Sequence, residues 1–246
     1  MKKILILAKR ELFSYFTSPL AFITLTCFLI LNGIIFWMIT DLTNRPESPY
    51  GAVMRLFFGG TIFYWLFLFI FIPVITMKLF SEEIKSGSIE LLMTSPIKEF
   101  QIVLGKYLGA ALFYIFLWTP TIIYPVILNH YTSIDFGPVV SGYAGSILTG
   151  LFFISIGMFC SAVTKSQVSS AILSFAVIAC VFLAGLLSGF FMDPSTVKFF
   201  DYINAMNYME TFGKGIIDSR AIAYLVSCSA GIIFLNIRYL ETRKWL

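Results

Sequence analysis

A single polar stretch, Ser161-Ala-Val-Thr-Lys-Ser-Gln-Val-Ser-Ser170, interrupts the apolar run from Phe136 to Met192, and Lys165 within it is the only charged residue of that run. One helix of this length would be about 85 Å long, whereas the hydrocarbon core of a bilayer is about 30 Å thick. The run must therefore fold back on itself. The sequence predicts two antiparallel membrane-spanning helices, at about 138–162 and 168–192, with Lys165 in the turn at one membrane face.

The same pattern extends over the whole chain of 246 residues, of which 59% are hydrophobic and only 12% are charged. A soluble domain carries about 25% charged residues. Uncharged stretches long enough to cross a bilayer recur, and they lack the alternation of a β-barrel strand. We therefore expect an all-α polytopic membrane protein, a single membrane domain over 1–246 with six spans at about 20–40, 56–77, 107–129, 138–162, 168–192 and 221–237.

The basic residues predict the orientation, because Lys and Arg concentrate in cytoplasmic loops. If the N-terminus lies inside, 12 of the 17 basic residues fall on the cytoplasmic side. We therefore expect both termini to lie in the cytoplasm. No dense basic stripe is present, so nucleic acid is not an expected partner.

Two segments outside the spans are expected to be helical. Residues 2–17 form an amphipathic pattern typical of an interfacial helix, with an ordinary charged tail as the alternative. The apolar face of this helix is predicted to contain Ile4, Leu5, Ala8, Leu12, Tyr15 and Phe16. Residues 193–220 are expected to form two short helices in the outer leaflet, with Asn207 as a helix cap and Gly213 and Gly215 as a stop; a small exposed helical hairpin is the alternative.

The long cytoplasmic connection over 78–106 carries three local signals. Gly87 is expected to end a first helix in the left-handed conformation, and Ser88 to cap a short second helix. Ser95-Pro96 is typical of the start of the helix that enters the third span. The short helix would present an amphipathic knob suited to a groove in a partner protein, formed by Ile89, Glu90, Leu92 and Met93. An ordinary solvated linker satisfies the same local signals.

The sequence contains no Gly-x-x-x-x-Gly-Lys-Ser/Thr loop, so the chain is not expected to bind ATP phosphates itself. The predicted spans lack the ionisable groups that proton-coupled carriers and intramembrane enzymes need. His130 is the only histidine, and we expect no metal site. The chain is therefore not expected to be an enzyme.

These residues resemble the membrane subunit of type-2 ATP-binding-cassette transporters. The resemblance covers essentially the full chain and is strongest at Phe80-x-x-Glu83-x-x-x-Gly87-Ser88-x-Glu90-Leu91-Leu92-x-x-Ser95-Pro96, followed by Gly105-Lys106. Members commonly carry Thr at the position of Ser88, and Ser keeps the hydroxyl. A shorter pattern around Gly215-Ile-Ile-Asp-Ser-Arg220 and Tyr224 is similar to the gliding-motility (GldF-like) branch.

The resemblance implies an N-terminal elbow helix, a coupling helix between spans two and three, and re-entrant outer helices before span six. It also implies a second permease subunit, identical or different, and two copies of a cytoplasmic ATPase that holds ATP and Mg²⁺. The implied ATPase-coupling residues are Glu83, Gly87, Ser88, Ile89, Glu90, Leu91, Leu92, Met93 and Pro96. Glu83 matches an acidic position that the family places near the elbow helix and the ATPase.

Span five carries Gly185-x-x-x-Gly189, a spacing that lets helix backbones approach closely. The two glycines suit packing within the chain as well as packing between two permease subunits. The resemblance implies that span five lies at the seam between the subunits. A path lined by small hydroxyl and aromatic groups suits an amphipathic or lipid-like substrate. The leading hypothesis is export driven by the partner ATPase. The alternative is a membrane anchor that relays the ATPase cycle to a periplasmic auxiliary protein without transport.

Overall fold

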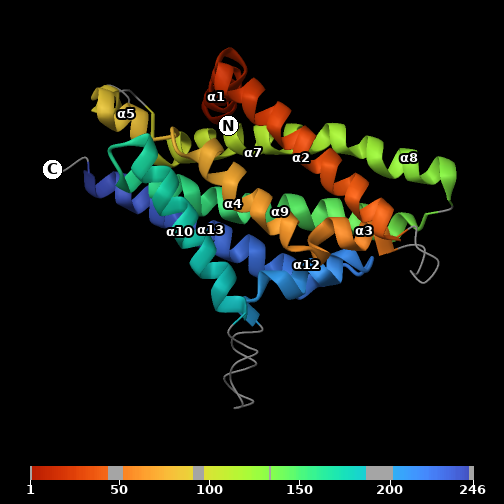
Figure 1. Cartoon of the computed structure of the whole chain (residues 1–246). Helices are drawn as coiled ribbons and strands as arrows, with labels where there is room; N and C mark the ends of the chain where they lie inside the picture. Colours follow the sequence, from red (N-terminus) through yellow and green to blue (C-terminus); the bar gives the residue numbers. More distant parts are fainter. Residues whose placement is uncertain (1, 44–51, 91–96, 133, 187–201, 244–246) are drawn as a thin grey trace.

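The computed structural model describes residues 2–43, 52–90, 97–132, 134–186 and 202–243, and they are helical with short connections (Figure 1). The helices in chain order are α1 (Lys2–Thr17), α2 (Pro19–Thr43), α3 (Ala52–Arg55), the π-helical turn η1 (Leu56–Gly60), α4 (Ile62–Thr76), α5 (Ser81–Ser86), α7 (Glu99–Trp118), the 3₁₀ turn η2 (Thr119–Ile122), α8 (Ile123–Tyr131), α9 (Phe136–Val163), α10 (Gln167–Leu186), α12 (Ala205–Gly213) and α13 (Ser219–Arg243).

The prediction of an all-α membrane protein is confirmed. Six described segments are long and apolar enough to cross a membrane: Pro19–Thr43, Ile62–Ser86, Glu99–Tyr131, Phe136–Val163, Gln167–Gly185 and Ser219–Thr242. The turn at Lys165 is confirmed as well, because α9 ends at Val163 and α10 begins at Gln167. The lone charged residue of the apolar run therefore marks the fold-back, as its position predicts.

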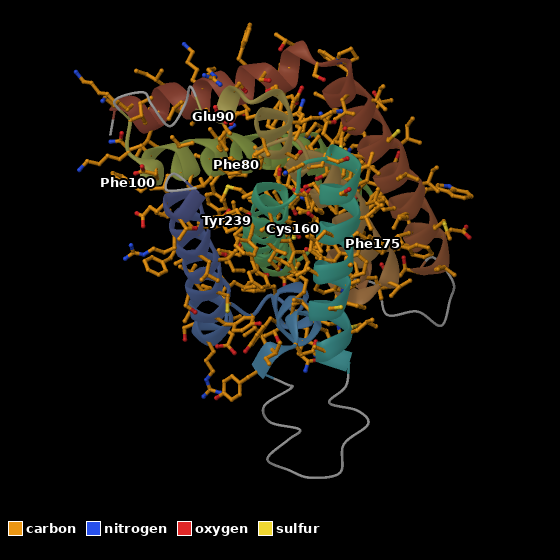
Figure 2. All side chains as sticks on the ribbon, turned by 90° about the vertical axis from the view of Figure 1, so that its left-hand side faces the viewer. Phe80, Glu90, Phe100, Cys160, Phe175 and Tyr239 are labelled. Atoms are coloured by element: carbon orange, nitrogen blue, oxygen red, sulfur yellow. The ribbon has the colours of Figure 1, made fainter. Side chains whose placement is uncertain are left out.

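Helix α9 lies at the centre of the bundle, where it contacts α4, α7, α10, α12 and α13. Seen from one end of the bundle, α9 with Cys160 lies between α13 with Tyr239 and α10 with Phe175 (Figure 2). Glycine and serine recur along the buried side of α9, and such small residues let neighbouring helices approach closely in a bilayer. The outer helices α2, α10 and α13 are mostly exposed, as expected of helices that face lipid.

The second predicted span, 56–77, is not one continuous helix. Phe58 and Gly59 leave the helical conformation, and Gly59 has a φ of 88°, which only glycine adopts without strain. A Cβ atom at Gly59 would collide with the side chain of Met209 on α12. The break therefore makes room for α12, and the uninterrupted helix begins at Ile62. The third span is interrupted too, by the 3₁₀ turn η2, which contains Pro120.

Helix α1 occupies the predicted residues, but its buried face differs from the predicted one. Leu7, Ala8 and Tyr15 are buried, whereas Leu5 is 63% exposed. Ala8 and Tyr15 belong to the predicted face, whereas Leu7 does not. In the structure α1 packs against α7, and that contact selects which apolar side chains are covered.

The segment 202–220, which is predicted to lie on the outer side, contains α12, whose cap differs from the predicted one. The side chain of Asn204, not of Asn207, accepts hydrogen bonds from the first backbone N–H groups of the helix. The predicted stop is confirmed, since α12 ends at Gly213 and Gly215 has a φ of 87°. The other predicted outer helix falls largely on 187–201, outside the described residues.

Candidate functional site

A buried ion-pair cluster joins three helices at the end of the bundle that also carries α5. The ammonium of Lys106 on α7 lies 3.0 Å from a carboxylate oxygen of Glu11 on α1. It also lies 2.8 Å from a carboxylate oxygen of Glu83 on α5. Lys106 is only 3% exposed, and two short charge-assisted hydrogen bonds offset the loss of its hydration.

Two glycines bring α1 close enough for this pairing. A Cβ atom at Gly105 would lie 2.6 Å from the Cβ of Leu7, and a Cβ at Gly109 would lie 2.6 Å from the Cβ of Glu11. Real Cβ atoms do not approach so closely, so α1 rests directly on the backbone of α7. Gly105 and Gly109 thus set the distance at which Glu11 reaches Lys106.

The hydroxyl of Ser161, near the end of α9, positions the segment that carries Glu83. It accepts hydrogen bonds from the backbone N–H groups of Phe80 and Ser81, at 3.0 and 3.1 Å. It also donates to the carbonyl of Met77 at 3.0 Å. Because these three residues connect α4 to α5, the central helix α9 fixes the point at which the chain leaves span two.

Tyr15 holds α1 against α4 beside the cluster. Its hydroxyl donates to the carbonyl of Ile75 at 2.6 Å, and its ring stacks on Phe113 of α7. Burial raises the pKa of Tyr15 far above its usual range, so this hydroxyl is a permanent donor. α1 is thereby tied to both span two and span three.

A cavity of about 200 Å³ opens next to the cluster. Acidic and basic side chains from α1, α7 and the connection between α4 and α5 line it, together with Ser14, Tyr15 and Leu79; the charged ones are Arg10, Glu11, Lys78, Glu82, Glu83 and Lys106. This end of the bundle therefore combines a buried ion-pair cluster, in which Oε2 of Glu83 has no hydrogen-bond partner among the described residues, with a space that charged groups surround.

The structure brings only part of the predicted coupling set to this site. Glu83 contributes the ion pair with Lys106, and Arg10 of α1 approaches it at 3.6 Å. Gly87 ends α5 with a φ of 73°, as predicted. Glu90 is exposed at the same end of the molecule (Figure 2). Leu91, Leu92, Met93 and Pro96 lie outside the described residues.

Two local predictions in this segment are wrong. Helical structure begins at Ser88 itself, and the carbonyl of Gly87 accepts the first hydrogen bond, so Ser88 is not the cap. Its hydroxyl instead lies 2.8 Å from that of Ser86. Ile89 is buried in the core of the chain, 8% exposed, so it does not face a partner as predicted.

The start of α7 also differs from the prediction at Ser95-Pro96. The helix begins at Glu99, after an extended Lys98 whose backbone N–H donates to the side chain of Gln101. Ile97 packs against the core. An extended approach lets Ile97 reach the bundle before the helix starts, which explains the shift of three residues.

In span five, Gly185 packs against another part of the same chain. A Cβ atom on Gly185 would lie 2.8 Å from the side-chain oxygen of Asn204, whose amide nitrogen donates to the carbonyl of Gly185 at 2.9 Å. Gly189 lies outside the described residues. Packing between subunits through these glycines stays a prediction.

Sequence reasoning missed Lys106 and Glu11 as members of the site. Lys106 was expected at the end of the cytoplasmic connection, in the Gly105-Lys106 pair of the resemblance, and Glu11 was given no role in a site. The signal that could have found them is Gly105-x-x-x-Gly109, which surrounds Lys106. This spacing marks a helix face on which a second helix can pack closely. A lysine between the two glycines therefore lies beside that second helix.

The comparisons with known proteins agree with this architecture. Residues 10–225 match the family described as ABC-2 family transporter protein. The match covers most of the chain, and the protein belongs to this family of ATP-binding-cassette transporter permeases. No curated protein matches the chain.

Proposed function

We propose that this member of the ABC-2 transporter family couples ATP hydrolysis by a separate cytoplasmic ATPase to the export of an amphipathic or lipid-like substrate. The observation that carries the proposal is the Lys106 cluster, in which short ion pairs join α5 to α7 and α1. The ATPase supplies the sites for ATP and Mg²⁺. This chain supplies the path for the substrate and a lever, by which we mean the helices that transmit the motion of the ATPase.

The proposed lever starts at the segment after Gly87, where the ATPase binds. A push on this segment displaces α5 and with it the carboxylate of Glu83. Separating Glu83 from Lys106 would break the shorter of the two ion pairs of a buried ammonium, which then keeps only Glu11 as a partner, and this is costly. The cheaper response is for α7 and α1 to move together with α5, which transmits the motion into span three.

The proposed assembly contains two copies of the ATPase and a second permease subunit, identical or different, in the bacterial inner membrane. Gly185 and Gly189 of span five are proposed at the seam between the permeases, and both termini are placed in the cytoplasm. The finer assignment to the gliding-motility branch rests on the pattern at 215–220 and remains part of the proposal.

Removal of residues 88–93 tests where the ATPase binds. We expect the full chain without them to insert into the membrane but to lose co-purification with the ATPase. Full-strength binding after the deletion would contradict the docking proposal.

Glu83→Gln tests the coupling step separately. It keeps the docking segment and weakens the link to Lys106, so ATPase binding should persist while ATP-dependent export from reconstituted vesicles falls. Glu241→Gln, at an exposed ion pair on α13, is the control and should leave export unchanged. Export at the wild-type rate with Glu83→Gln would remove this ion pair from the coupling path.

A second candidate function is force transmission to a periplasmic auxiliary protein without transport. The attachment of α12 favours it, because Met209 and Phe212 are buried and the hydroxyl of Ser141 on α9 donates to the carbonyl of Phe212 at 2.6 Å. Motion of α9 would therefore carry α12 with it. A transport assay with the purified complex distinguishes the two functions, since only the exporter moves a substrate across vesicles.

A further inference from the structure

Two cations beside the Lys106 cluster have binding capacity left. Lys78 is half-buried, and among the described residues no carboxylate lies within 4.0 Å of its ammonium, so Glu82 and Glu11 attract it only from a longer distance. Its ammonium lies 5.0 Å from the centroid of the Tyr15 ring. Arg10 has one carboxylate at 3.6 Å, longer than the 2.7–2.9 Å of a charge-assisted hydrogen bond. Both side chains line the cavity of about 200 Å³, and so does Ser14.

The cavity also presents an acidic group with capacity left. Glu82 is exposed and lines the same space, and within the described part of the chain no Lys or Arg lies within 4.0 Å of its carboxylate. An occupant with only a negative charge would leave Glu82 opposed by a like charge. The lining therefore favours an occupant that carries a negative and a positive charge, with the negative group at Lys78 and Arg10 and the positive group at Glu82.

The surroundings of the cavity are apolar on one side. Ile6 and Phe13 are 67% and 68% exposed, and on α1 they lie at i−4 and i+3 relative to Arg10, which makes them its neighbours on the helix surface. Lys78 lies two residues after the end of the apolar helix α4. The cavity thus lies where apolar surface meets charge, which is the level of lipid headgroups.

We propose that this cavity binds a phospholipid whose headgroup carries a phosphate and a primary amine. Lys78, Arg10 and the hydroxyl of Ser14 receive the phosphate, Glu82 receives the ammonium, and an acyl chain lies along Ile6 and Phe13. The bound lipid would brace α1 against the connection between α4 and α5. This site is separate from the transported substrate and does not depend on the export reaction.

Lipid binding to the purified full chain tests the assignment, measured by native mass spectrometry during titration with phosphatidylethanolamine. The double variant with Arg10→Gln and Lys78→Gln should bind this lipid about tenfold more weakly, the size of one lost charge-assisted hydrogen bond. Lys85→Gln, on the exposed side of α5 outside the cavity, is the matched control and should bind as the wild type does. Equal affinity of the double variant and the control would overturn the site.

Two further titrations test the chemistry of the occupant. Phosphatidylglycerol, which lacks the amine, should bind to the wild type more weakly than phosphatidylethanolamine does. Glu82→Gln should bind the two lipids equally well. This test does not depend on the folding of the double variant. Equal binding of both lipids to the wild type would overturn the role of Glu82. Soluble glycerophosphoethanolamine should not compete at the same concentrations; effective competition would show a free phosphate ester, not a lipid, as the ligand.

Discussion

The two ends of the bundle are held together by different forces. At one end, α1, α5 and α7 meet around Lys106, a charge that is almost completely buried. At the opposite end, α12 packs into the bundle through Met209 and Phe212, which are 0% and 1% exposed. Its ion pair, between Arg55 and Glu210, is as short as those of Lys106, at 2.9 Å.

The difference lies in burial, not in distance. The side chains of Arg55 and Glu210 are 47% and 41% exposed, against 4% for that of Lys106. Water screens the exposed pair, so its contribution is small, whereas removing one member of a buried cluster leaves uncompensated charge. The end that carries α12, which is the predicted outer end, therefore depends on apolar packing, and the end around Lys106 depends on electrostatic complementarity.

Lys106→Met should produce the largest loss of stability. It removes the cation between the carboxylates of Glu11 and Glu83 and leaves only Arg10, 3.6 Å from Glu83, and we expect a loss of about 3–5 kcal/mol. Thermal unfolding of the purified protein measures it, with Lys85→Met as the exposed control. If the variant is as stable as the control, the Lys106 cluster does not stabilise this end of the bundle.

Gly109→Ala should have an intermediate effect. The added methyl group meets the Cβ of Glu11 at 2.6 Å and the carbonyl oxygen of Ala8 at 3.2 Å, so α1 must shift away from α7. Overpacking of this kind costs about 1–3 kcal/mol. Gly231→Ala on α13 is the matched control, since nothing lies within 4 Å of its added Cβ. If both variants unfold at the same temperature, α1 is not held by close backbone contact.

The sequence was sufficient to predict the six spans, because the cost of charge in a bilayer leaves few arrangements. The turn at Lys165 and the cap at Gly87 follow from strictly local chemistry. The break at Phe58 and Gly59 does not, because its cause is Met209, which lies about 150 residues further along the chain. A local pattern shows which conformations a segment can adopt, and tertiary contacts decide which of them it adopts.

The candidate site was predictable only where its residues belong to one segment. Glu83 and Gly87 lie in the motif around the α5 helix, and their positions follow from it. Lys106 and Glu11 meet across 95 positions of sequence, and no periodicity connects them. Ile89 shows the converse, since its amphipathic setting predicts exposure to a partner while the fold buries it.

The smallest effect is expected at the outer end, from Glu210→Gln. Hydrogen bonds from Lys214 and Arg55 lower the pKa of Glu210 in the folded protein. A carboxylate with a lowered pKa stabilises the fold at neutral pH and loses that contribution as the pH falls through the folded-state pKa. The variant should therefore unfold at a slightly lower temperature than the wild type at pH 7, and the two should converge in acid and at high salt, which screens exposed pairs. A difference between them that grew as the pH fell would show that the outer end depends on Glu210 for something other than its charge, and the contrast between the two ends would fail.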